Sequence, residues 1–112
     1  MKIALTSTGK EWSSEIDARF GRTEFIFVYD EEADSVEIID NSAVKNEAHG
    51  AGSATAQKMY EIKPDVLITG NGPGETAAKA LQKLEMKIFV DAHNLTIKEA
   101  YEKYKKGELK QL

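Results

Sequence analysis

The stretch that decides the fold is DVLITGNGPGETAAKAL, residues 65–81. It opens with an apolar run at 66–69, typical of a strand that is buried on both faces of a sheet. Glycines and a proline at 70–74 end that run. Apolar side chains then recur at the spacing of one helix face, at Ala77, Ala80, Leu81 and Leu84. A strand, a glycine-rich loop and a helix in this order predict a βα unit of a parallel sheet.

The flanking sequence repeats this pattern and places a hairpin in front of it. We expect strands at 3–6, 25–29, 35–40, 66–69 and 88–90, and helices at 53–62 and 77–84 and between Thr96 and Gly107. Thr96 and Glu99 have the spacing of a capping box, and 35–40 alternates like a half-exposed edge strand. The order β-β-β-α-β-α-β-α predicts one α/β domain over residues 1–112. We expect three α/β/α layers around a five-stranded mixed sheet, as in ribonuclease-H-like folds.

Composition excludes several classes of protein. The chain has 112 residues, a formal net charge of -4 and no cysteine. An acidic chain is unsuited to non-specific binding of nucleic acid, and without cysteine it has no disulfide, thiolate ligand or thiol nucleophile. No apolar run approaches the roughly 18 residues that span a bilayer. We therefore expect a cytoplasmic protein that contacts neither membranes nor nucleic acid.

The predicted topology gathers the unusual residues at one edge of the sheet. If the second strand is antiparallel to the first and third, the loops after strands one, three, four and five all leave from the carboxyl edge. These loops hold 7–10, 19–22, 49–53, 70–74 and 91–94. Ligands of open α/β sheets usually bind at that edge. The single tryptophan, Trp12, is expected to pack the long first loop against the domain.

Two loops at this edge could meet an anion. Residues 70–74 resemble a phosphate loop, but Glu75 replaces the third glycine of a dinucleotide fingerprint and no Gly-Lys-Ser/Thr follows. They could hold an anion at the helix start through Asn71 and Gly72, or simply form a tight turn. Arg19 and Arg22, with Lys10 as a possible third cation, are the best anion-binding candidates, the alternative being solvated arginines.

Both histidines also belong to this edge. His49 lies beside Gly50 and Gly52, which allow close approach of the backbone to a ligand. Ser53 could cap the following helix, and the His49 imidazole could bind a metal or an anion, or be solvated. His93 is the second imidazole, but two histidines are a small set for zinc. Asp91 could add a carboxylate, although capping and turn formation is the favoured explanation for it.

Catalysis is not indicated. No serine has a nucleophile-elbow setting, and neither histidine is linked to one in the sequence. A ribonuclease-H-like nuclease needs an acidic residue within the first strand, which here is Ile-Ala-Leu-Thr, and Asp65 lies at the wrong end of its strand. We therefore expect a protein that is not an enzyme.

Several motifs occur in a familiar order along nearly the whole chain. They are Met1-Lys2-Ile3-Ala4, Phe20-Gly21-Arg22, the hairpin, His49-Gly50-Ala51-Gly52, the strand and loop at 65–73, and Thr96-Ile97-Lys98-Glu99-Ala100. In this order they resemble the dinitrogenase iron-molybdenum cofactor biosynthesis family. The resemblance implies a ribonuclease-H-like fold and a small non-catalytic protein. Such a protein binds or carries an iron-sulfur or iron-molybdenum cluster, or its precursor, during metallocofactor assembly.

The resemblance also implies roles for particular residues. An anionic cluster suits Arg19, Arg22 and the helix starts, and its metal suits an imidazole, with His49 first and His93 second. The cofactor-binding set is then Arg19, Arg22, His49, Gly50, Gly52, Asn71 and Gly72, and the partners are cofactor-assembly proteins. Two further hypotheses stay open: a binding module for a small phosphate or carboxylate ligand, and a protein-interaction domain that uses the strand at 35–40.

Overall fold

The computed structural model describes residues 1–45 and 50–112 of the chain. Its elements are β1 (Lys2–Ser7), β2 (Phe25–Asp30), β3 (Ser35–Asp40), α1 (Ser42–Lys45), α2 (Ala51–Ile62), β4 (Val66–Ile68), α3 (Glu75–Leu81), β5 (Lys87–Val90), α4 (Ile97–Lys105) and β6 (Lys110–Gln111). Every strand and main helix predicted from the sequence is present, within a few residues of its expected bounds. The short α1 lies where the sequence predicted a loop.

A single mixed sheet organises the molecule, with the strand order β3-β2-β1-β4-β5-β6. β1, β4 and β5 run parallel, β2 is antiparallel to both of its neighbours, and β6 is antiparallel to β5. The expected number of five strands is therefore wrong, because β6 adds a sixth. Its two residues are polar and exposed, so no apolar pattern marks them, and only the pairing of Lys110 with Val90 and of Gln111 with Phe89 makes them a strand.

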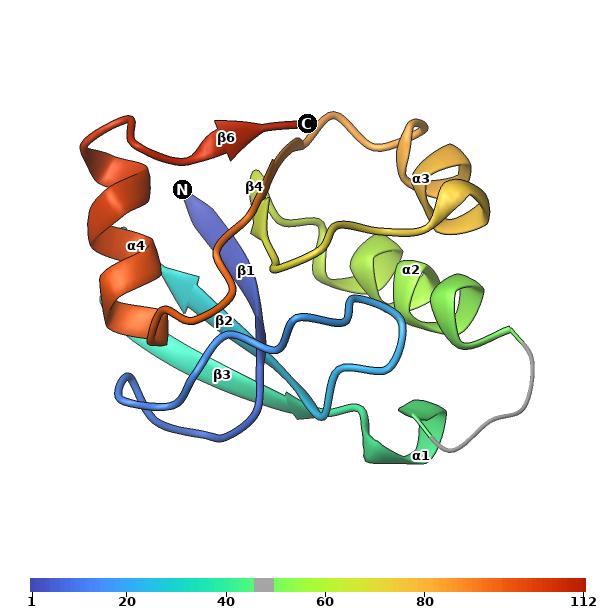
Figure 1. Ribbon diagram of the computed structural model, residues 1–112, viewed down its shortest axis with the longest axis horizontal. Helices are drawn as coiled ribbons and strands as arrows, with labels where there is room; N and C mark the ends of the chain where they lie inside the picture. The colour runs from blue at the N-terminus through green and yellow to red at the C-terminus, as the bar shows by residue number, and fades with distance from the viewer. Residues whose placement is uncertain (46–49) are drawn as a thin grey trace.

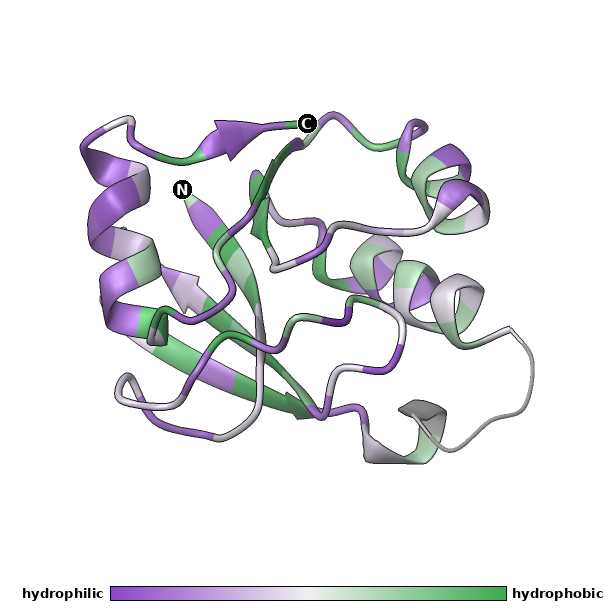
Figure 2. Cartoon of the chain, viewed as in Figure 1, coloured by the Kyte–Doolittle hydropathy of each residue, from purple (hydrophilic) through white to green (hydrophobic). Residues whose placement is uncertain are grey.

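Two hydrophobic clusters fill the two faces of the sheet, because successive side chains of a strand point to opposite faces. On one face, Ala4, Val28 and Leu67 pack under α2 and α3. On the other, Leu5, Phe27, Val66 and Ile68 pack under Ile97 and Ala100 of α4. Figure 1 shows α4 on one side of the sheet and α2 with α3 on the other. In Figure 2 hydrophobic colour is concentrated on the inner strands of the sheet, while β6 and much of α4 are hydrophilic. The ribonuclease-H-like assignment stays a prediction.

Trp12 fixes the long first loop against the second of these clusters, as expected. Its ring lies edge-on to Phe27, Tyr29 and Tyr101, at centroid distances of 4.9, 5.0 and 5.8 Å. Aromatic pairs in this edge-to-face arrangement are favourable beyond the area they bury. The loop is therefore held at its middle as well as at its ends.

The helix starts differ from one another in a way that matters for the site. α2 begins at Ala51, two residues earlier than predicted, and its N-cap is Gly50 in the left-handed region at φ 78°. The expectation that Ser53 caps this helix is therefore wrong. The capping box of α4 is confirmed: the backbone N–H of Glu99 donates to Oγ1 of Thr96 at 3.1 Å, and the N–H of Thr96 donates to Glu99 Oε1 at 2.9 Å.

Candidate functional site

The carboxyl ends of β1, β3, β4 and β5 lie at the same edge of the sheet, as the sequence predicted. β1, β4 and β5 are parallel, and β3 runs in the same direction because β2 is antiparallel to both β1 and β3. We call the loops at this edge, residues 8–24, 50–53, 69–74 and 91–96, the carboxyl rim. In open α/β sheets such a rim is the usual place for a ligand.

The long loop is joined to the ends of β1 and β4 by buried hydroxyl groups. The Oγ1 of Thr6 donates to the carbonyl oxygen of Asp17 at 2.8 Å and lies 2.9 Å from the Oγ1 of Thr69. The Asp17 N–H donates to the Thr6 carbonyl oxygen at 2.9 Å. Both threonines are fully buried. Buried polar groups are costly unless they are hydrogen-bonded, so moving this loop away from Thr6 would leave buried groups unpaired. These bonds therefore fix residues 17–24 over the sheet edge.

The same loop lies directly on the first turn of α2. A Cβ built at Gly21 would lie 2.9 Å from both the Cα and the N of Gly52, so only glycine permits this approach. The hydroxyl of Thr55 donates to the Gly21 carbonyl oxygen at 2.7 Å. Buried Asn41 donates to Oγ1 of Thr55 and to the carbonyl oxygen of Thr23, each at 3.1 Å. The arginine-bearing loop and the start of α2 thus form one unit.

The loop after β4 packs on residue Ala18. A Cβ at Gly70 would lie 2.5 Å from the Cα of Ala18, and the Asn71 N–H donates to the Ala18 carbonyl oxygen at 2.8 Å. The Asp91 N–H donates to the Gly70 carbonyl oxygen at 2.7 Å, which adds the loop after β5. Gly72 has a φ of 86°, a conformation that favours glycine. The structure therefore brings Gly72 and Asn71, which is exposed, to the same rim as residues 17–22.

Arg19 has a partner that the sequence analysis did not assign. Its Nε lies 3.2 Å from Oδ1 of Asp17, whose side chain is 4% exposed, while the Arg19 side chain is 53% exposed. The Asp17 carboxylate also accepts from the N–H of Arg19 and of Glu24. This contact raises the pKa of Arg19 above its usual value, through the hydrogen bond and then the charge of Asp17. Asp17 thus positions Arg19, and the i, i+2 spacing of an acid and an arginine was the signal available for it.

The other candidates lie elsewhere on the rim or outside the described residues. Arg22 is half-buried in the same loop, beside Gly21 and so beside the start of α2. His93 is exposed in the loop after β5, between Asp91 and Asn94, which both have left-handed φ values of 64° and 70°. His49 lies outside the described residues. The pairing of two imidazoles therefore stays a prediction.

A metal site made of protein side chains is not present in residues 1–45 and 50–112, where no three His, Asp or Glu side chains come close enough to hold an ion. The whole sequence has no cysteine. The donors at the rim are instead backbone N–H groups and guanidinium groups. Such donors suit an anion that brings its own inner ligands.

The three helices that start at the rim offer different surroundings to an anion. α3 carries Glu75 in its first turn and α4 carries Glu99, which also closes its capping box. α2 has no acidic residue in its first turn, and its N-cap glycine has no side chain to cap it. A helix start with free N–H groups favours negative charge by about 0.3–1 kcal/mol. Of these three helix starts, the first turn of α2, beside residues 17–22, is the one without a carboxylate.

The fold is that of a small α/β protein with a single sheet, whose loops gather at the carboxyl edge of that sheet. The chain belongs to the dinitrogenase iron-molybdenum cofactor family, whose model matches residues 1–107. The family resemblance inferred from the motifs is thereby confirmed.

Two solved structures are similar over nearly the full length of both chains. The apo form of the orange protein from Desulfovibrio gigas is 32% identical, with a TM-score of 0.92 over 99% of this chain and 92% of the other. A NifB-like protein from Thermotoga, of the DUF35 family, is 31% identical, with a TM-score of 0.84 and the same coverage. No curated protein matches the sequence. None of the helices in the described residues is long and apolar enough to cross a membrane.

Proposed function

We propose that this protein binds and carries an anionic metal-sulfur cluster, an iron-sulfur or iron-molybdenum cluster or its precursor, without catalysing a reaction. The observation that carries the proposal is the uncapped, acid-free first turn of α2, packed against the loop of Arg19 and Arg22 through Gly21 and Gly52. Membership of the dinitrogenase iron-molybdenum cofactor family supports the class of cargo. Cofactor-assembly proteins are then the donors and acceptors of the cluster, and the cytoplasm is where it acts.

The donor set defines how such a cargo would be held. With no thiolate in the chain, the cluster keeps its inorganic sulfide ligands and is bound through its negative charge. Backbone N–H groups of residues 51–53 and the guanidinium groups of Arg19 and Arg22 supply hydrogen bonds and charge. His49 is the first candidate for direct contact with a metal and His93 the second. Binding of this kind is reversible, which a carrier requires.

The test is an anaerobic titration with synthetic iron-sulfur and iron-molybdenum-sulfur clusters, read by charge-transfer absorbance, together with elemental analysis of protein purified without oxygen. Ser53→Asp places a carboxylate in the first turn of α2, where Ser53 is exposed. That change favours the helix but repels an anion, so binding should weaken about tenfold without loss of stability. Gln57→Glu adds the same charge one turn later and is the matched control.

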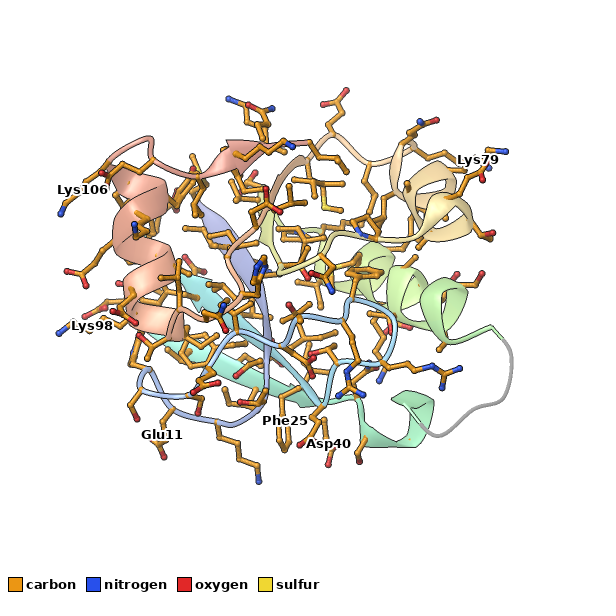
Figure 3. The ribbon with its side chains drawn as sticks, in the orientation of Figure 1. Glu11, Phe25, Asp40, Lys79, Lys98 and Lys106 are labelled. Atoms are coloured by element: carbon orange, nitrogen blue, oxygen red, sulfur yellow. The ribbon has the colours of Figure 1, made fainter. Side chains whose placement is uncertain are left out.

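Arg22 and His49 are tested in the same titration. Arg22→Gln and His49→Ala should each lower affinity. Lys106→Gln removes one positive charge at the far end of α4 and should not, since that residue lies well away from α2 (Figure 3). A wild-type spectrum that does not change, with no metal in the purified protein, excludes the cluster as cargo.

A second candidate is a small phosphate or carboxylate ligand at the same rim. It is favoured by the absence of any group of metal-ligating side chains among the described residues. Inorganic phosphate is the probe. Amide shift changes at 51–53 and 70–74 with phosphate, and none with clusters, favour this candidate over the carrier.

A further inference from the structure

β3 ends the sheet, and its outer edge is open. Among the described residues no strand lies beyond it in the order β3-β2-β1-β4-β5-β6. The N–H of Asn41 donates to the carbonyl oxygen of Glu24. Asn41 and Glu24 are therefore a hydrogen-bonded pair of the antiparallel ladder between β3 and β2. Because hydrogen-bonded pairs alternate along an antiparallel ladder, the N–H and C=O groups of Val36 and Ile38 point away from β2. These two residues offer four backbone groups to a further strand.

The strand has few of the features that usually protect an edge. It is six residues long, contains no proline and no lysine, and pairs with β2 without a bulge. Val36 is 41% exposed. Its cross-strand neighbour is Tyr29, which packs with Trp12, so its side chain extends an apolar surface on one face of the sheet. Glu37 points to the opposite face and is also exposed.

Negative charge is the one protective feature of this hairpin. Residues 30–40 contain no lysine or arginine, and their carboxylates are Asp30, Glu31, Glu32, Asp34, Glu37 and Asp40. Lys105 pairs with Glu31 at 2.9 Å, and Lys58 donates to the Asp40 carbonyl oxygen. The remaining charge disfavours a second copy of this chain as the occupant, because two such strands would place like charges opposite each other.

We propose that the outer edge of β3 binds an extended segment of a partner protein in which apolar residues alternate with Lys or Arg. Backbone groups of Val36 and Ile38 pair with the segment. Its apolar side chains extend the surface of Val36 and Ile38, and its basic side chains lie on the face of Glu37. Val36 and Ile38 belong to β3 and are not among the rim residues 8–24, 50–53, 69–74 and 91–96, so this proposal goes beyond the carrier function and does not depend on it.

The test uses 15N-labelled full-length protein and a five-residue capped peptide of alternating Lys and Val. Amide shifts should change at 35–40, most at Val36 and Ile38. A peptide of the same sequence that is N-methylated at every residue has no backbone N–H to donate to β3, so it should bind at least about tenfold more weakly. A Glu-Val peptide should not bind, and rising salt should weaken the Lys-Val peptide.

Val36→Pro removes an outward N–H without removing a ladder bond and should abolish the shifts, with dispersed amide signals showing that the variant is folded. The N-methylated peptide tests the same point on the unaltered protein. Equal binding of the methylated and plain peptides, or shifts scattered over all acidic residues, overturns strand pairing. If the amide shifts of Val36 and Ile38 change with protein concentration and not with peptide, a second copy of this chain binds the edge of β3. That result overturns the proposal of a basic partner segment.

Discussion

Replacing Gly70 by alanine should separate the long loop from the sheet edge. The added Cβ would lie 2.5 Å from the Cα of Ala18 and 3.1 Å from its carbonyl oxygen, both of them backbone atoms. Carbon atoms in contact need about 3.5–4.0 Å, so the loop must move by about 1 Å. Overpacking of this kind costs about 1–3 kcal/mol. Weakening of the hydrogen bond from Asn71 to Ala18 adds about 1 kcal/mol.

The free energy of unfolding should therefore fall by about 3 kcal/mol, which for a urea m value near 1.5 kcal/mol/M lowers the midpoint by about 2 M. The fluorescence of Trp12, packed against three aromatic rings, reports the transition. Gly52→Ala is the control, because its Cβ would make an ordinary 3.4 Å contact with Ala77 inside a helix, and helix propensity favours alanine by up to about 1 kcal/mol. A Gly70→Ala midpoint close to the wild-type value would refute the packing of the loop on β4.

Three further changes test other parts of the structure. Thr96→Ala removes the capping box of α4 and should cost about 1 kcal/mol in urea unfolding, whereas Thr96→Asn should keep most of it. Asn41→Ala leaves buried partners unpaired and should cost about 2–3 kcal/mol, measured in the same way. Hydrogen bonds from Tyr101 and Lys105 hold the pKa of Glu31 below its usual 4.5. The stability from this contact is present above that pH and is lost as pH falls through the folded-state pKa, so Glu31→Gln should flatten the acid side of the stability profile.

The sequence predicts the part of the fold that hydrophobic periodicity determines. The uniformly apolar Val66–Ile68 became a central strand, and the alternating Ser35–Asp40 became the edge strand. The capping box of Thr96 and Glu99 placed the start of α4 to the residue. In each case the signal lies within a few neighbouring residues, so no knowledge of the tertiary structure is needed.

Elements that depend on distant contacts were not predictable in this way. The two polar residues of β6 form a strand only because β5 offers an open edge. The start of α2 was placed two residues late because Gly50 and Gly52 read as a loop. Gly52 belongs to the helix, and Gly21 packs on its backbone, a contact between residues 31 positions apart that no local pattern contains.

For the candidate site, too, the sequence predicted one part and missed another. Strand directions alone predicted that residues 19–22, 49–53 and 70–74 share one edge, and the structure brings residues 19–22, 50–53 and 70–74 together there. The sequence did not distinguish the three helix starts as anion sites, because each has a glycine or a hydroxyl residue at the N-cap. The first-turn carboxylates of α3 and α4 oppose a negative ligand, and Asp17 holds Arg19 on the loop that covers α2. The first turn of α2 therefore carries less negative charge than those of α3 and α4, and a single added carboxylate at Ser53 should remove that difference.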